Sequence, residues 1–480
     1  DYGSLKGQGI PYSFADLYAK TSFNSANGSK INVFGFNFTD SVNYQNVSNL
    51  GWRSYGFGSN FVIIPGTSPV LIDGNFSYSK YGISMTEPLQ KPKESSISGF
   101  NMGLNFTYYL QKDELKYGID LEAFSTTYTF YTPLNSEVKL DGSNTEAVGY
   151  LRYKMVFNKL VFEPGIHLHY YAKLNEFSPE PRVGAKYNVT NKFRVKMAAG
   201  TYSQNFISAS SDRDVVNLFY GFLTGPENIA GENGEPVESK LQKSLHLVGG
   251  FEYDLPYNFD LNIEAYYKNF YQLTNINRFK TFEDTPENAS QPDDLKKDFI
   301  VETGDAKGID FTLKYDYKRL YFWATYSYAF VTRKQGDIEY PPHFDRRHNL
   351  SLVTAYTFGK GGNWEIDGRW NFGSGFPFTE TQGVFSKLNF NDGFNTDYTK
   401  ANGDIAFQYG EINKGRLPIY HRLDATLKRR IEVSKRVWLE ANISVTNIYN
   451  RQNIFYKDRL TGKEVYQLPI LPSAGLSLNF

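Results

Sequence analysis

The chain has 480 residues, no cysteine, and 51 basic against 51 acidic side chains. This neutral balance excludes the positive surface that a nucleic-acid-binding protein needs, and the lack of cysteine excludes disulfides and thiolate metal sites. Aromatic residues make up 17 % of the chain, which suits the ring-rich girdles of a membrane β-barrel better than a globular enzyme. Mean hydropathy is negative and no run of about eighteen apolar residues is present, which excludes a helical membrane protein.

Period-two alternation predicts strands along nearly the whole chain, beginning near residues 12–23. Apolar and polar side chains alternate in the same way over residues 100–108, 259–273, 320–330 and 437–449. Many of these runs are roughly ten to fifteen residues long, whereas strands of soluble proteins average about five or six. Because a strand that crosses a bilayer at a tilt needs the greater length, the pattern indicates transmembrane strands.

The predicted connections alternate between short turns of Gly, Asn, Asp and Lys and long loops. Long loops are predicted at residues 132–145, 206–240, 274–297, 334–344, 378–420 and 451–464. Bacterial outer-membrane barrels have this pattern, with short turns in the periplasm and long loops outside. A β-propeller would instead repeat every forty to fifty residues or so, and the sequence shows no such repeat.

The chain ends on an alternating run in which Leu476, Leu478 and Phe480 share one face, and small or polar residues occupy the other. One face of a barrel strand meets lipid and the other meets a wet lumen, so this ending is typical of the strand that closes a membrane barrel. An edge strand of a β-sandwich is the alternative. We therefore predict an all-β fold, an antiparallel transmembrane β-barrel.

Counting back from this last strand gives about nineteen strands, and the first runs in the same direction as the last. A closed antiparallel barrel of this kind has an even number of strands. The odd number implies either a miscounted strand or strands outside this chain, and we favour the second interpretation. A barrel of roughly twenty-two strands would then lack its first three here.

Several segments resemble TonB-dependent receptors, in particular those of Bacteroidota. Each segment alone is weak evidence, but the set as a whole is specific to this family. They are residues 178–184, which read Ser-Pro-Glu-Pro-Arg-Val-Gly, with 193–204, and also 304–311, 342–349, 373–378 and 445–450, together with the Phe480 ending. The resemblance covers nearly the whole chain. It implies a multi-pass protein of the cell outer membrane, in contact with outer-membrane lipid.

The same resemblance implies an N-terminal plug of well over a hundred residues that fills the barrel, and an N-terminal box that grips the energy-transducing protein TonB. This sequence departs from the pattern, since it contains neither plug nor box and lacks the first strands. We therefore treat residues 1–480 as one outer-membrane β-barrel domain. It is either a portion of a longer protein or a derived barrel that has lost transport.

By resemblance, the leading function is TonB-dependent uptake of a scarce nutrient: an iron chelate, haem, an oligosaccharide or a peptide. The alternative is a structural or partner-binding subunit of an outer-membrane complex without transport activity, and a surface lipoprotein resting on the long loops fits either function. An upstream plug and TonB box, and ligand-dependent uptake, would distinguish the two. No acid–base or nucleophile set stands out, so neither enzyme activity nor a cofactor is expected.

Two clusters near the predicted outer rim are candidate ligand contacts. Asp212, Arg213 and Asp214 begin a long loop whose following apolar run, 215–222, is predicted to form a short helix or hairpin folding into the mouth. The alternative is ion pairing within the loop. His343, Asp345 and Arg346 come after another loop, and their alternative is a salt-bridged strand start.

His167 and His169 lie two residues apart on one strand, with Glu163 and Tyr171 on the same lumen-facing side. This spacing could hold a metal ion. A solvated pair in the lumen is the interpretation we favour, and no metal site is predicted.

Overall fold

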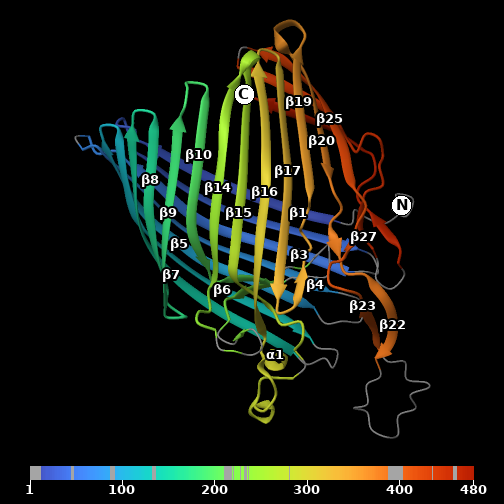
Figure 1. Ribbon diagram of the computed structural model, residues 1–480. Helices are drawn as coiled ribbons and strands as arrows, with labels where there is room; N and C mark the ends of the chain where they lie inside the picture. The colour runs from blue at the N-terminus through green and yellow to red at the C-terminus, as the bar shows by residue number, and fades with distance from the viewer. Residues whose placement is uncertain are drawn as a thin grey trace.

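The structure is a computed structural model. It describes residues 12–480 except 45–47, 67, 87–91, 132–136, 210–218, 220, 227–228, 232–234, 236, 281, 388–403, 435 and 458–461. The described residues form one large, curved antiparallel sheet, whose long strands run side by side from one end of the molecule to the other (Figure 1).

The sheet contains twenty-one strands, of which β13 (Ile229–Ala230) and β18 (Ile338–Tyr340) are short additions, so nineteen long strands make the wall. They are β1 (Tyr12–Asn24), β2 (Lys30–Tyr44), β3 (Ser48–Ile63), β4 (Val70–Thr86), β5 (Lys93–Leu110), β6 (Asp113–Tyr131), β7 (Glu137–Phe157), β8 (Leu160–Tyr171), β9 (Glu176–Asn188), β10 (Phe193–Gln204), β14 (Gln242–Leu255), β15 (Phe259–Ile276), β16 (Phe299–Tyr317), β17 (Leu320–Gln335), β19 (His348–Phe358), β20 (Trp364–Gly373), β25 (Tyr420–Ser434), β26 (Val437–Thr446) and β29 (Leu471–Asn479). Each pairs antiparallel with the next, for example β1 with β2 and β26 with β29. The predicted all-β fold of about nineteen strands is confirmed.

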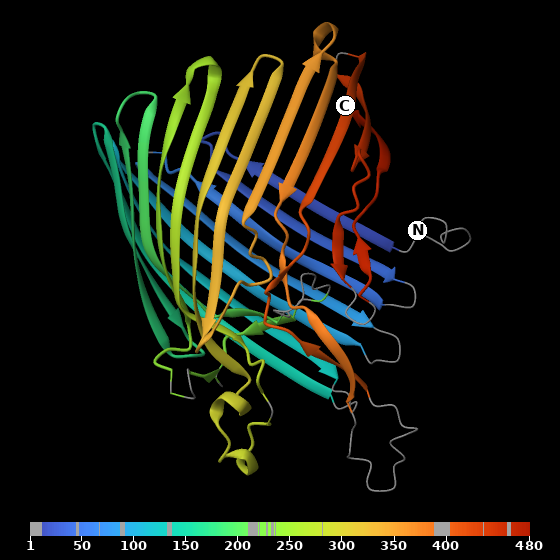
Figure 2. The ribbon, with the colours of Figure 1, turned by 45° about the vertical axis from the view of Figure 1, so that its right-hand side comes forward.

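The two ends of the sheet differ in their connections, and we name them the short-turn end and the long-loop end. At the short-turn end, three of the turns contain only two residues each, and they include Gln111, Asn158 and Lys318. The φ angles of these three residues are positive, at 56°, 44° and 55°. Positive φ in such short hairpin turns matches the right-handed twist of the paired strands. At the long-loop end, long connections follow β10, β15, β20 and β26 (Figure 2).

The prediction of a long loop at 132–145 was wrong. Strands β6 and β7 continue as a hairpin in which Tyr131 pairs with Glu137. Residues 141–146 are polar or glycine at every position, so they carry no apolar face for an alternation pattern to detect. A strand that extends beyond the bilayer has no lipid contact and therefore needs no such face.

The predicted strand over 437–449 ends earlier, at Thr446, because Asn447 takes up left-handed backbone geometry with φ of 54°. The Asn447 side chain is fully buried and donates hydrogen bonds from Nδ2 to the carbonyl oxygens of Arg451 and Leu468, at 2.9 and 3.1 Å. Asparagine tolerates this geometry and satisfies the turn's carbonyl groups at the same time. The residue thus fixes how the β26–β29 loop leaves the sheet.

The two faces of the sheet differ as the alternation predicted. On β8, Ile166, Leu168 and Tyr170 are exposed on the outer surface, with 38, 38 and 42 % of each residue accessible. On the last strand, Leu476 and Leu478 are 76 and 58 % exposed. Apolar side chains that remain exposed along a whole sheet face are expected where that face meets lipid.

The two outermost strands, β1 and β29, each have one neighbour in the described sheet, namely β2 and β26. Their outer edges pair with no strand of the described residues, and every described side chain of β1 is exposed. Because nineteen strands alternate in direction, β1 and β29 run parallel to each other. Closure of the barrel by the strand of Leu476, Leu478 and Phe480 therefore stays a prediction.

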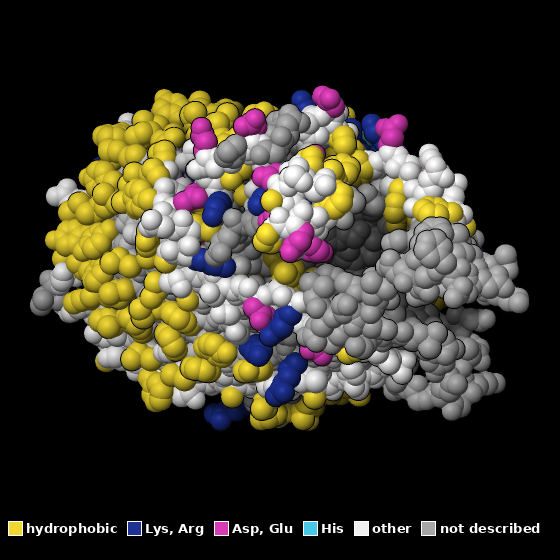
Figure 3. All heavy atoms as spheres, turned by 90° about the horizontal axis from the view of Figure 1, so that it is seen from below, with side chains coloured by type: hydrophobic (Ala, Val, Ile, Leu, Met, Phe, Trp, Pro, Cys, Tyr) yellow, Lys and Arg dark blue, Asp and Glu magenta, His cyan; other side chains and the backbone are white. Residues whose placement is uncertain are grey.

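Shorter elements gather at the long-loop end. They are the two-stranded pairs β11 (Phe206–Ala209) with β12 (Gly221–Thr224), β21 (Pro377–Phe378) with β24 (Gly415–Arg416), β22 (Thr381–Lys387) with β23 (Asp404–Tyr409) and β27 (Ile454–Lys457) with β28 (Glu464–Tyr466), and the helix α1 (Asp293–Lys296). Seen from this end, hydrophobic side chains cover the outer flank, and charged ones gather over the loops (Figure 3). In the described part of the chain, no helix has the length and apolar character to span a membrane.

Candidate functional site

The inner face of strands β7 to β10 carries a cluster of rings and charges near the long-loop end. His167, His169 and Tyr171 alternate with the exposed outer residues of β8, so they lie on the inner face. The strand register pairs Tyr150 of β7 with His167, and His167 with Glu180 of β9. Paired residues project from the same face of a sheet, which brings these side chains together over the lumen.

Four of the rings form a continuous ladder along this wall. Tyr150 and His167 stack with centroids 5.2 Å apart, His167 and His169 lie 6.3 Å apart, and His169 and Tyr171 lie 5.9 Å apart. Their planes diverge by 16 to 21°. The histidines are therefore half-buried members of a stack and not a solvated pair, and no group of three or more metal-ligating side chains occurs among the described residues.

Glu180 is the buried charge at the centre of this cluster, with 2 % of its side chain exposed. Its Oε2 accepts a hydrogen bond from Arg182 Nη2 at 2.6 Å, and His169 Nε2 lies 3.5 Å away. Its Oε1 accepts hydrogen bonds from the backbone N–H and the hydroxyl of Ser203, at 2.7 and 2.6 Å. Both oxygens are thus satisfied, as burial of a carboxylate requires.

Arg182 connects the buried carboxylate to the lumen surface. Its guanidinium lies 4.5 Å from the ring centroid of Tyr202 and 3.3 Å from His167 Nε2, and about a third of its side chain is exposed. A Cβ on Gly200 would lie 3.0 Å from Arg182 Cγ, so glycine leaves room for this side chain. Tyr202 in turn packs on His246 at 4.4 Å. The wall therefore presents a guanidinium and several rings to the lumen.

The β11–β12 hairpin folds inward over this region. Phe222 packs edge-on against Tyr81 at 5.6 Å, and its backbone N–H donates to Ser95 Oγ at 3.0 Å. Ile207 and Leu223 are 95 % buried. The residues that contact Ile207, Phe222 and Leu223 lie on the inner faces of strands β4 to β7 and on β16. A hairpin that folds inward is present, but residues 206–209 and 221–224 form it. Only residues 221 and 222 of the predicted run 215–222 belong to it, and most of that run lies outside the described residues, so a helix or hairpin within the run itself stays a prediction.

The base of the hairpin is linked to the ring-lined wall. Asn205 donates from Nδ2 to Asn144 Oδ1 at 2.9 Å, and Asn144 donates to Glu146 Oε1 at 2.5 Å. Both asparagines are 1 % exposed. A Cβ on Gly225 would overlap Asn205 Oδ1, at 1.4 Å, so a side chain there would displace the Asn205 amide. The inward position of the hairpin is thus built into the wall.

The predicted contacts Asp212, Arg213 and Asp214 lie outside the described residues, in the segment between β11 and β12. Their role as ligand contacts stays a prediction.

The predicted contacts Asp345 and Arg346 are described, and both are engaged within the protein. Asp345 is 1 % exposed and accepts hydrogen bonds from Val331 N and Arg347 Nε, each at 3.0 Å, and from Arg416 Nη2 at 2.5 Å. Arg416 also donates to the carbonyl oxygens of Asp345 and Gly375. These contacts match the salt-bridged strand start that was the alternative interpretation.

Arg346 donates from Nε to the Ser374 carbonyl at 3.1 Å and lies over the rings of Phe376 and Tyr420, at 4.4 and 5.3 Å. Burial lowers the pKa of the Arg346 guanidinium, and the adjacent Tyr420 partly opposes that shift. His343 packs edge-on against Phe344 at 5.2 Å. The sequence located this cluster correctly, but its residues hold loops together, and their contact with a ligand stays a prediction.

The substitution Asp345→Asn is expected to lower the free energy of unfolding by about 2–3 kcal/mol, because two guanidinium groups lose a buried charged acceptor. Chemical unfolding and limited proteolysis of the 374–419 loop would measure the effect. Asp337→Asn, in the exposed turn of the same loop region, is the matched control and should change stability by less than about 0.5 kcal/mol. Normal stability combined with weaker ligand binding would instead favour the ligand-contact role.

Sequence reasoning did not single out Glu180, Arg182, Tyr202 or His246 as site residues. Glu180 and Arg182 were visible only inside the Ser-Pro-Glu-Pro-Arg segment. The signal available in the sequence was their spacing. Two charged residues that lie two positions apart on a strand project from the same face, and β9 pairs with β8, the strand that carries His167 and His169.

The chain was then compared with known proteins. A family model described as TonB dependent receptor-like, beta-barrel matches residues 2–450. No curated protein sequence matches the chain.

Solved structures share the fold at low sequence identity. The FrpB iron transporter from Neisseria meningitidis is 13 % identical, with a TM-score of 0.66 over 98 % of this chain and 72 % of that one. The ferric citrate transporter FecA is 11 % identical, with a TM-score of 0.63 over 97 % of this chain and 70 % of that one. The siderophore receptor PirA from Acinetobacter baumannii is 10 % identical, with a TM-score of 0.62 over 98 % and 71 %.

Proposed function

Because the chain belongs to the TonB-dependent receptor family of outer-membrane β-barrels, we propose that it takes up a scarce nutrient from outside the cell. Members of the family are multi-pass outer-membrane receptors and transporters, not enzymes, and they interact with TonB. In such barrels the short turns face the periplasm and the long loops face outward. The ring-lined wall and the inward hairpin then lie at the extracellular mouth.

The observation that carries the proposal is the wall formed by His167, Arg182, Tyr202 and His246 beside the inward hairpin. Rings stack on flat ligand faces, and a guanidinium recognises carboxylate and similar anionic groups. Among the four candidate nutrient classes, an iron chelate with carboxylate groups suits this chemistry best. FecA is named as a ferric citrate transporter and PirA as a siderophore receptor. Asp212, Arg213, Asp214, His343, Asp345 and Arg346 remain further proposed contacts at the rim.

The domain organisation that goes with this function includes a plug and additional strands encoded with this barrel. The outer edges of β1 and β29 pair with no strand of the described residues, and the two strands run parallel, so an odd number of strands is needed between them to complete an antiparallel barrel. Three strands would give the twenty-two or so expected from the resemblance. The intact native polypeptide should then be heavier than 54.9 kDa by at least the mass of a plug.

The uptake proposal can be tested in cells that produce the full-length protein, with radiolabelled ferric citrate, haem, a maltooligosaccharide and a short peptide as probes. We expect uptake of ferric citrate that stops when the proton gradient is dissipated. Tyr202→Ala should weaken it about five- to tenfold, because a stacking surface is lost. Leu168→Ala, on the outer face of β8, is the matched control and should leave uptake unchanged.

Energised uptake of a different probe would keep the transport function and reassign the substrate. No energised uptake of any probe, with the protein held in a stable complex, would favour the structural or partner-binding subunit. A surface lipoprotein bound to the long loops would be compatible with either result.

A further inference from the structure

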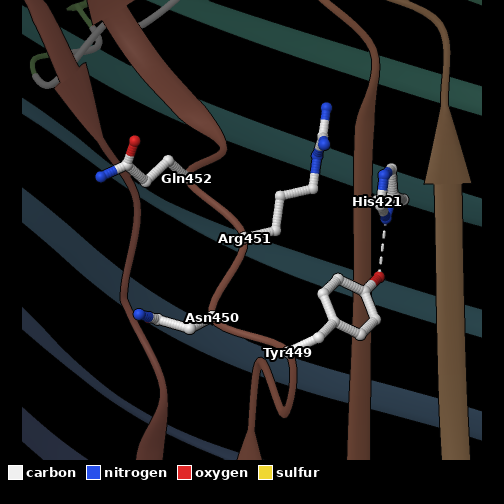
Figure 4. A pocket seen from close by; sticks show the side chains of 5 residues that line it. All are labelled: His421, Tyr449, Asn450, Arg451 and Gln452. Carbon is white, nitrogen blue, oxygen red and sulfur yellow. Dashed lines mark hydrogen bonds between the residues drawn. The ribbon is translucent and has the colours of Figure 1, made fainter.

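A cavity open to the surface lies on the opposite, lipid-facing side of the sheet, at its extracellular end. It measures about 510 Å³ and is lined by His421, Tyr449, Asn450, Arg451 and Gln452 (Figure 4). Its side of the sheet follows from the strand register, which pairs Phe372 with His421 and Ile366 with Leu427. Both Ile366 and Leu427 are exposed outer residues. The intervening positions, such as Asp367 and Asp424, are charged and face the lumen.

The walls of this cavity are fixed by two buried asparagines. Asn453, which is 4 % exposed, accepts from the His421 backbone N–H at 3.2 Å and donates to the His421 carbonyl at 2.9 Å. Asn447 accepts from the Arg451 backbone N–H at 3.0 Å and donates to the Arg451 carbonyl at 2.9 Å. His421 and Arg451 are therefore positioned before any ligand binds, which lowers the entropic cost of binding.

The hydrogen bonds inside the cavity occupy one ring nitrogen of His421 and leave the other open. Trp370 Nε1 can only donate, and it lies 3.3 Å from the Tyr449 hydroxyl. The same hydroxyl lies 2.7 Å from His421 Nδ1. In the tautomer in which the hydroxyl donates to Nδ1, neutral His421 carries its proton on Nε2. No described residue hydrogen-bonds to Nε2, so in this tautomer it offers the cavity a donor.

Arg451 adds a full positive charge beside this donor. Its Nη2 donates to the Ile419 carbonyl at 3.1 Å, and it forms no ion pair with a carboxylate of the described residues. In Figure 4, Arg451, His421 and Tyr449 lie on one side of the loop, whereas Asn450 and Gln452 point to the other. An uncompensated guanidinium next to an N–H donor selects an anionic ligand with several acceptor oxygens.

The level of the cavity in the membrane identifies the source of that anion. Trp370 and Phe372 lie beside its lining residues His421 and Tyr449, at the long-loop end of the lipid-facing surface. Trp364, at the short-turn end of the same strand, stacks with Arg429 across a distance of 4.9 Å. Such paired belts of rings mark the two headgroup levels of a membrane barrel. The cavity therefore opens at the outer headgroup level, beside lipid and not beside the lumen.

We propose that His421 and Arg451 bind the phosphate of an outer-leaflet lipid headgroup. Arg451 supplies the charge, His421 Nε2 supplies a neutral donor, and the neighbouring apolar surface contacts the acyl chains. The site is independent of the nutrient site, which lies on the opposite face of the sheet.

The test is native mass spectrometry of the delipidated full-length protein in detergent, titrated with phosphatidic acid or with phosphatidylcholine. We expect the wild type to bind phosphatidic acid more tightly than phosphatidylcholine. Arg451→Gln should weaken phosphatidic acid binding about tenfold, and His421→Phe should weaken it less, because a neutral donor contributes less than a charged one. Thermal unfolding checks that each variant keeps its fold.

The matched control is Arg429→Gln, which removes an arginine from the same face of the sheet at the opposite headgroup level. It should leave phosphatidic acid binding unchanged. Equal losses in the Arg429 and Arg451 variants, or no loss in the Arg451 variant, would overturn the site. Displacement of the lipid by millimolar inorganic phosphate would overturn the assignment to a lipid headgroup and indicate a free-phosphate site.

Discussion

Glu302→Gln is expected to lower the free energy of unfolding by about 3–5 kcal/mol, the usual cost of removing one partner from a buried ion pair. The Glu302 side chain is fully buried at the extracellular start of β16. Its carboxylate accepts a hydrogen bond from Arg278 and from the Tyr340 hydroxyl at 2.9 Å, and Arg333 Nη1 lies 3.6 Å away. Glutamine keeps the shape but leaves two guanidinium groups without this counter-charge.

Urea unfolding of the detergent-solubilised full-length protein would measure this effect. Glu339→Gln is the matched control, because Glu339 is an exposed carboxylate of the neighbouring β18 segment, and its loss should cost less than about 0.5 kcal/mol. A double variant, Arg278→Met with Glu302→Gln, should be less destabilised than the sum of the two single variants. Additive losses would mean that the pair is not coupled, contrary to the structure.

Arg182→Met should have the second large effect, because it acts on both stability and uptake. The buried Glu180 carboxylate would lose its 2.6 Å contact with the guanidinium and keep only Ser203 and the more distant His169. We expect a loss of about 3 kcal/mol in unfolding free energy. Ferric citrate uptake should also fall about tenfold or more, since the wall loses its charged donor.

Arg152→Met provides the comparison on β7, two strands away from Arg182 in the sheet. Arg152 pairs with Glu163 at 3.4 Å, but 43 and 31 % of the two side chains are exposed, so the pair should contribute less than about 1 kcal/mol. Arg182→Lys separates the two roles, since it keeps the charge near Glu180 and loses the planar stacking on Tyr202. Stability near wild type together with weak uptake in this variant would assign Arg182 to the ligand. Unchanged uptake in both Arg182 variants would remove it from the proposed site.

The mouth of the barrel shows why loop function is difficult to predict from sequence. The apolar run after Asp214 predicted that the loop would fold inward. Its docking partners, such as Tyr81 and Ser95, lie more than a hundred residues earlier in the chain. No local pattern joins residues so far apart, and only the curvature of the sheet brings them together.

The charged cluster at residues 342–349 shows the opposite case, in which the sequence located the structure but not its role. The sequence 342–349 marked a charged strand start, and the structure places one there. The sequence could not show that Asp345 is buried by Arg416, which arrives from a loop about seventy residues later. The same residue types therefore suggested a ligand contact and a structural ion pair equally well, and burial favours the second role.

The sequence alone determined the architecture. In a barrel strand, period-two alternation assigns each side chain to lipid or to lumen, so strand number, direction and the lipid-facing surface follow from local pattern. Tertiary structure alone determined where the residues of the two proposed sites come together. Glu180, Arg182, Tyr202 and His246 come from three strands, and His421, Tyr449 and Arg451 come from one strand and a separate loop. Their proximity depends on register and loop closure, which act between segments far apart in the chain and leave no local periodic signal.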